Sequence, residues 1–105
     1  MMHGAQHREV EIKSLLKEEL VKAAPLLKDH KVLLFGSRAR GTAHSRSDFD
    51  IGILGKESLS LLAFYEIEDM LENLPTLYKI DLVDLNRVSQ KFRDHALREA
   101  EVLYE

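Results

Sequence analysis

Two aspartates, Asp48 and Asp50, stand one residue apart at the start of an apolar segment. Side chains alternate across a strand, so in a strand both carboxylates would point to the same face, roughly 6–7 Å apart. Like charges so placed repel each other unless a cation lies between them, and Mg²⁺ takes carboxylate and phosphate oxygens. The alternative for such a pair taken alone is a solvated strand edge with incidental acids.

A third carboxylate, Asp81, lies inside the apolar run Ile80-Asp81-Leu82-Val83. A carboxylate in such a strand costs free energy unless it is paired or bound to a metal ion. A metal ligand and an ion pair with Lys or Arg fit this position equally well. Asp84 follows three positions later, on the opposite face of a strand, and we predict that it is either structural or an acid at the end of the strand.

Gly36 and Ser37 directly follow the apolar run Lys31–Phe35. Glycine lets the backbone approach a ligand closely, and the N–H groups that open a following helix can bind phosphate. The alternative is a strand-to-helix turn with Ser37 as N-cap. Arg38 and Arg40 follow on the predicted short helix and are candidates to neutralise a triphosphate, although they could equally be surface charges. Arg46 is a weaker candidate of the same kind.

The same segment partly matches a P-loop, G-x-x-x-x-G-K-[ST], through Gly36 and Gly41. The lysine position holds Thr42, and Ala43 follows it. Because the side chain that reaches the phosphates is missing, a P-loop NTPase is excluded. A phosphate-binding turn followed closely by paired acids indicates instead chemistry on a metal-bound nucleoside triphosphate.

The spacing of apolar residues predicts the elements that must position these groups. We expect a helix over residues 8–24 ended by Pro25, a strand over 31–35, a short helix over 37–40 closed by Gly41, a loop over 42–47, a strand over 48–54, a helix over 58–73, a strand over 77–85 and a last helix over 89–103. This order indicates an α/β or α+β domain with a small sheet and flanking helices.

Alternation along the second strand predicts which of its side chains face the core. Phe49, Ile51 and Ile53 form the apolar set. The acids share the other face with Gly52, whose missing side chain we expect to leave room for a ligand.

The length, the net charge and the absence of certain residue types narrow the class of protein. The 105 residues predict a single domain spanning 1–105. A net charge of -3 argues against a generic nucleic-acid-binding module, so we expect no direct binding of nucleic acid. The chain has no cysteine, and its histidines form no cluster, so no histidine is assigned to a metal. We expect neither a membrane span nor a signal peptide, and therefore a cytoplasmic protein.

Gly36-Ser37, ten residues and then Asp48-Phe49-Asp50 resemble the signature of the polymerase-β-like nucleotidyltransferase superfamily. Asp81 matches its third carboxylate on a neighbouring strand. The wider text around Gly36, and from Ser47 to Ile51, is similar to the minimal nucleotidyltransferase (MNT) subgroup in particular, which adds Ser47 to the candidate nucleotide-binding residues. The resemblance covers nearly the whole chain.

This resemblance implies the small mixed sheet of the superfamily, and two Mg²⁺ ions held by Asp48, Asp50 and Asp81 as the catalytic and metal-binding residues. It implies transfer of AMP from ATP to a hydroxyl, with Gly36, Ser37, Arg38, Arg40 and Ser47 on the nucleotide. Many minimal members are antitoxins that adenylylate a tyrosine of a HEPN-domain toxin. We therefore expect a protein adenylyltransferase paired with such a toxin. The alternative is a non-catalytic antitoxin that neutralises its partner by occlusion.

Overall fold

Four strands form one mixed sheet in the computed structural model, which describes residues 4–43 and 47–105 and the side chains of 9–43 and 47–105. The spatial order is β3-β2-β1-β4. The strands are β1 (His30–Phe35), β2 (Phe49–Gly55), β3 (Ile80–Asp84) and β4 (Glu101–Tyr104). Strand β1 runs antiparallel to both of its neighbours, whereas β2 and β3 are parallel.

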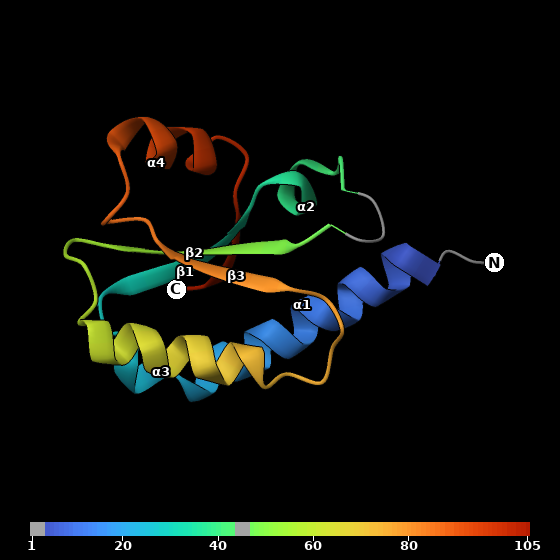
Figure 1. Ribbon diagram of the computed structural model, residues 1–105, viewed down its shortest axis with the longest axis horizontal. Coiled ribbons are helices and arrows are strands. Elements are labelled where there is room, and N and C mark those ends of the chain that lie inside the picture. Colours follow the sequence, from blue (N-terminus) through green and yellow to red (C-terminus); the bar gives the residue numbers. More distant parts are fainter. Residues whose placement is uncertain (1–3, 44–46) are drawn as a thin grey trace.

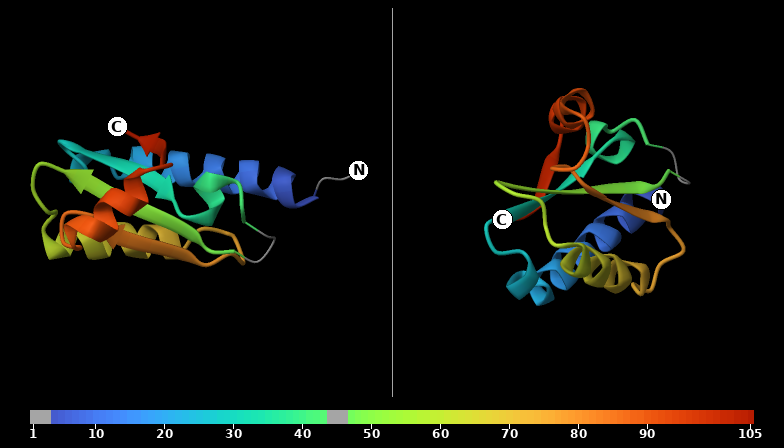
Figure 2. Two further views of the ribbon diagram at one scale, coloured as in Figure 1. Left: turned by 90° about the horizontal axis from the view of Figure 1, so that it is seen from above. Right: turned by 60° about the vertical axis from the view of Figure 1, so that its left-hand side comes forward.

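Helices cover both faces of this sheet (Figure 1). The helical segments are α1 (Gly4–Lys22), the 3₁₀ turn η1 (Ala24–Leu26), α2 (Ser37–Arg40), α3 (Leu61–Glu72) and α4 (Gln90–Leu97). Helices α1 and α3 lie on one face, while α2 and α4 lie side by side on the other, as the right view of Figure 2 also shows. None of the described helices combines the length and apolar character needed to cross a membrane.

Strand β2 separates two apolar clusters, because its side chains alternate between the faces. Phe49, Ile51 and Ile53 are fully buried in the larger cluster, which α1 and α3 cover. The smaller cluster lies beneath α4 and comprises Leu33, Phe35, Leu85 and Ala96. The expected apolar face of this strand is thus confirmed, and its acids lie on the α4 side.

The local sequence patterns predicted most of the helices and strands correctly. Helix α1 ends at Lys22, just before Pro25, which stands in the 3₁₀ turn η1. The helix over Ser37–Arg40 is present, and Gly41 closes it in the left-handed conformation with φ 76°. Helix α3 begins at Leu61 rather than at residue 58, because the Ser60 side chain accepts a hydrogen bond from the Ala63 N–H as its N-cap.

The predicted last helix over 89–103 is wrong in its second half. Ser89 caps α4 as expected, but the helix ends at Leu97, and Glu101–Tyr104 forms β4. This strand pairs with β1 and buries Leu103. The third strand is also shorter than the predicted 77–85, because Leu77 is fully exposed and pairing with β2 starts at Ile80.

Candidate active site

Asp50 and Asp81 lie beside each other on parallel strands. The register of β2 and β3 pairs these two residues directly, and by alternation both stand opposite the side chains of Ile51 and Leu82, which pack in the larger cluster. Asp48 stands one residue before β2 and is partly exposed. The structure therefore brings Asp81 beside Asp50 from a distant segment, and Asp48 stands two residues before Asp50 along the chain.

The electrostatics of Asp50 reflect the acids that lie near it. Burial raises the pKa of the Asp50 carboxyl above its ordinary value of 3.8, and the charges of Asp81 and then Asp48 raise it further. The Arg40 guanidinium lowers it. A carboxylate in such surroundings is electrostatically frustrated until a cation joins it.

Gly36 brings the backbone directly against Asp50. Its φ of 76° and ψ of -157° belong to a region that essentially only glycine occupies. A Cβ built at this position would overlap the Asp50 carboxylate. Gly36 is itself the N-cap of α2, with its carbonyl accepting from the Ala39 and Arg40 N–H groups. The alternative of a Ser37 N-cap is therefore wrong, since Ser37 is the first helical residue.

Arg38 points away from the carboxylates, into the core. Its guanidinium lies 4.4 Å from the ring centroid of Phe49, which faces the opposite side of β2 from Asp50. It pairs with Glu9 of α1 at 3.3 Å and donates through Nη2 to the Ser47 carbonyl at 2.8 Å. Arg38 thereby ties the segment before Asp48 to α1 and α2. A direct contact with nucleotide stays a prediction.

The other predicted binding residues divide by exposure. Arg40 is exposed on α2, whereas Ser37 is half-buried. Ser47 is half-buried too, and its carbonyl accepts from Arg38. Arg46, the weaker candidate of this loop, lies outside the described residues.

The expected ligand space beside Gly52 is absent. A Cβ at Gly52 would collide with the Leu85 side chain and crowd Phe35, so the apolar cluster under α4 fills this position. Asp84 is structural, as predicted. It is buried, pairs with Arg87 at 3.1 Å and accepts from the Asn86 N–H at 2.9 Å. The site is therefore confined to the end of the sheet near Gly36, Asp50 and Asp81.

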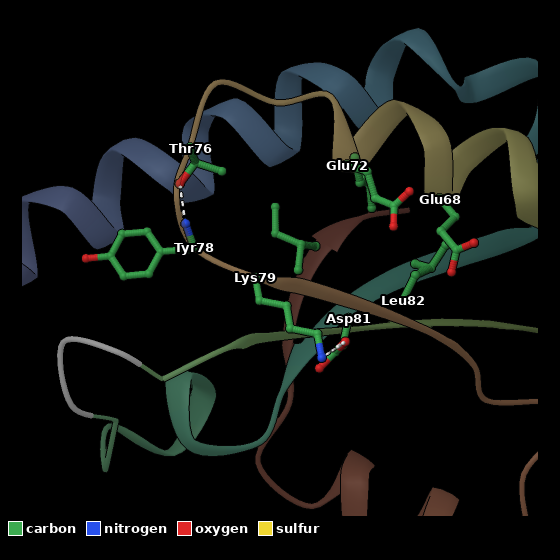
Figure 3. A pocket seen from close by; sticks show the side chains of 9 residues that line it. Glu68, Glu72, Thr76, Tyr78, Lys79, Asp81 and Leu82 are labelled. Atoms are coloured by element: carbon green, nitrogen blue, oxygen red, sulfur yellow. Dashed lines mark hydrogen bonds and ion pairs between the residues drawn. The ribbon is translucent and has the colours of Figure 1, made fainter.

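Lys79 is a residue that the sequence analysis missed. Its Nζ lies 3.6 Å from an Asp81 carboxylate oxygen, and the two side chains reach toward each other beside β3 (Figure 3). The spacing of Lys79 and Asp81 could have predicted this ion pair, since residues two apart on an extended chain share a face. The Lys79 side chain is 70% exposed, so this ion pair is weak and a stronger cation can displace it.

A pocket of about 380 Å³ adjoins this pair at the edge of the sheet. Glu68 and Glu72 of α3 line it together with Asp81 (Figure 3). Within residues 4–43 and 47–105, however, no group of three or more His, Asp or Glu side chains stands close enough to form a metal cage. A metal ion here would need ligands from its substrate.

The model of the family "Polymerase beta, Nucleotidyltransferase" matches residues 11–105. The chain belongs to the polymerase beta nucleotidyltransferase family. A family member from Methanocaldococcus jannaschii, provisionally named a protein adenylyltransferase, is 34% identical over 83% of this chain and 100% of its own. Because the match begins within α1 and runs through β4, it includes every element that carries a candidate site residue.

Solved structures of toxin-antitoxin complexes share this fold. A crystal structure described as a toxin-antitoxin with AMP-PNP matches with a TM-score of 0.63 and 26% identity, over 84% of this chain and 72% of that one. A complex of a tri-AMPylated Shewanella oneidensis HEPN toxin with MNT antitoxin matches with a TM-score of 0.60 over 88% of this chain and 71% of that one. Its 22% identity supports the likeness of fold alone.

Proposed function

We propose that this chain is a Mg²⁺-dependent protein adenylyltransferase that transfers AMP from ATP to a tyrosine hydroxyl of a partner protein. The observation that carries the proposal is the junction of Asp50, Asp81 and Gly36, where paired acids adjoin a backbone turn that only glycine can form. Family membership and the resemblance to AMP-transferring relatives support the same reaction.

The donor set fits Mg²⁺. This ion prefers oxygen ligands, keeps several waters and is commonly held by one or two carboxylates together with substrate phosphates. Asp50 and Asp81 supply such carboxylates side by side, and burial together with the charges of Asp81 and Asp48 raises the pKa of the Asp50 carboxyl. When bound, Mg²⁺ would neutralise phosphate charge and orient the reacting oxygens. Asp48, Asp50 and Asp81 are the residues proposed to hold it, with two ions as the expected number.

The residues of this chain would divide the remaining work. The Gly36 N–H and Ser37 hold the outer phosphates at the start of α2. The acceptor oxygen forms a bond to the α-phosphorus as the bond to the bridging oxygen breaks, so AMP stays on the acceptor and pyrophosphate leaves. Asp81 lies on the edge strand, where a partner can approach, and is the proposed acceptor of the hydroxyl proton.

The partner is proposed to be a HEPN-domain toxin, and this chain its antitoxin. A relative of similar fold is complexed with an AMPylated toxin of that kind. The described residues form one small α+β unit, so we expect the acceptor to arrive on a folded partner. Because ATP is available in the cytoplasm, we propose that location for the pair.

Intact mass spectrometry tests this function. The chain is co-expressed with the protein encoded beside it, and the partner is weighed after separation under denaturing conditions. We expect mass increases of one or more AMP units, which disappear when Asp50→Asn replaces the parent. A partner of unmodified mass that regains activity once separated would support the non-catalytic, occluding antitoxin instead.

A further inference from the structure

A small basic hollow adjoins the candidate active site on the side away from Asp81. Its volume is about 90 Å³, and it lies where α2 meets the end of α4. Gly36 and Arg40 line it from the α2 side, and His95, Ala96, Arg98 and Glu99 line it from the α4 side. This volume is a few times the roughly 30 Å³ that one water molecule occupies in the liquid, so a phosphate group fits.

The charges around the hollow favour an anion. Arg40 and Arg98 are both exposed, and neither forms an ion pair within the part of the chain that the structure describes. Glu99 is the one acid of the lining, so the two guanidiniums leave a net charge of about +1 with His95 neutral. Guanidinium groups bind phosphate oxygens through paired N–H donors.

The order of the strands places this hollow in line with the position proposed for the triphosphate. Asp81, Asp50 and Gly36 stand on β3, on β2 and at the end of β1, which are successive neighbours in the sheet. With the α-phosphate at the acids and the next phosphate at Gly36, the chain of phosphates continues away from β3. The next groups in that direction are Arg40 and Arg98, since α2 and α4 lie side by side there (Figure 1).

We propose that Arg98, together with Arg40, binds the terminal phosphate of the nucleotide and so makes the site select triphosphates over diphosphates. The same contacts would hold the pyrophosphate as it leaves. Arg98 is in this sense a specificity-determining residue that comes from a different element than the Gly36-Ser37 turn. This inference rests on the proposed function, because it assumes that a nucleoside triphosphate occupies the site.

Calorimetry with Mg²⁺ and three probes, ATP, ADP and inorganic pyrophosphate, tests the proposal. Arg98→Ala removes a charge-assisted contact. It should weaken the binding of ATP and of pyrophosphate roughly tenfold or more, and leave the affinity for ADP nearly unchanged. Glu99→Gln should act in the opposite direction and tighten ATP binding, an effect that misfolding does not produce. Lys91→Ala, on the same helix but outside this hollow, serves as the control and should change none of the three affinities.

The outcomes separate this inference from the proposed function. If Arg98→Ala weakens the binding of ATP and of ADP equally, or changes neither affinity, the terminal-phosphate assignment is wrong while nucleotide binding by the parent stands. If the parent binds neither ATP nor pyrophosphate, both proposals fail. If Lys91→Ala and Arg98→Ala each reduce the binding of ATP, ADP and pyrophosphate to a similar extent, the hollow attracts anions without selecting triphosphates. The inference is then overturned.

Discussion

The Asp50 carboxylate lies directly against the backbone of Gly36, in the space that a side chain at position 36 would need. This contact links the phosphate-binding turn to the acids. It explains why the last residue of β1 is followed by glycine, and it gives a substitution that should disturb the site without touching any carboxylate.

We expect Gly36→Ala to lose most transfer activity and to lower the free energy of unfolding by about 1–3 kcal/mol, because the backbone there is essentially restricted to glycine. Gly41→Ala is the matched control. Gly41 has the same φ of 76°, but a Cβ there meets nothing within 4 Å, so only backbone strain of roughly 1–2 kcal/mol should appear. Urea unfolding and transfer assays on both variants separate strain from displacement of Asp50. Equal activity in the two variants would contradict the proposed role of this contact.

Asp50→Asn should abolish AMP transfer and leave the fold intact, because the side chain faces the site rather than the larger core. Without Mg²⁺ the variant should also be more stable than the parent at neutral pH. A carboxyl whose pKa is higher in the folded chain binds more protons when folded, so its contribution to stability is lost as pH rises from 3.8 through the raised value. Thermal unfolding in EDTA at pH 4 and pH 7 measures this effect. A stability difference that is the same at both pH values would count against the coupling of Asp50 with Asp81 and Asp48.

Arg38→Met should cost about 2–4 kcal/mol of stability, because it removes a buried guanidinium that pairs with Glu9 and holds the Ser47 carbonyl. Transfer should also fall, since the segment leading to Asp48 loses its support. Arg40→Ala, on the same short helix but exposed, should change stability by no more than about 0.5 kcal/mol. Chemical unfolding measures both variants. If Arg38→Met weakened ATP binding while leaving stability unchanged, Arg38 would be a nucleotide ligand rather than a structural clamp.

Binding of ATP should depend on a divalent cation, because carboxylates at Asp48, Asp50 and Asp81 repel a bare triphosphate. Calorimetry in Mg²⁺, and again after addition of EDTA, should show strong binding in the first condition alone. Lys79→Ala provides a second readout. Since Lys79 competes with the metal for Asp81, its removal should leave metal-dependent ATP binding intact or slightly tighter. Equal ATP affinity with and without metal would rule out the metal-bridged site.

Local patterns in the sequence were sufficient for the parts that depend on neighbours along the chain. Phe49, Ile51 and Ile53 are buried as the alternation predicts, and Gly41 ends α2 in the left-handed conformation. The Gly-Ser turn and the spaced aspartates identified the family, because their chemistry needs those residue types at that spacing. These features follow from side-chain periodicity and backbone sterics, which act over a few residues.

The features that depend on contacts between distant segments were decided by the tertiary structure alone. Residues 101–104 form a strand because β1 offers an edge to pair with, which local propensity cannot report. Arg38 is buried against Phe49 because Glu9 of α1, far away in sequence, supplies its counter-charge. The space at Gly52 is filled by Leu85, which directly follows β3, and Asp50 meets Asp81 through the register of two strands. Each outcome depends on a contact between distant segments, whose position the packing of the whole chain determines.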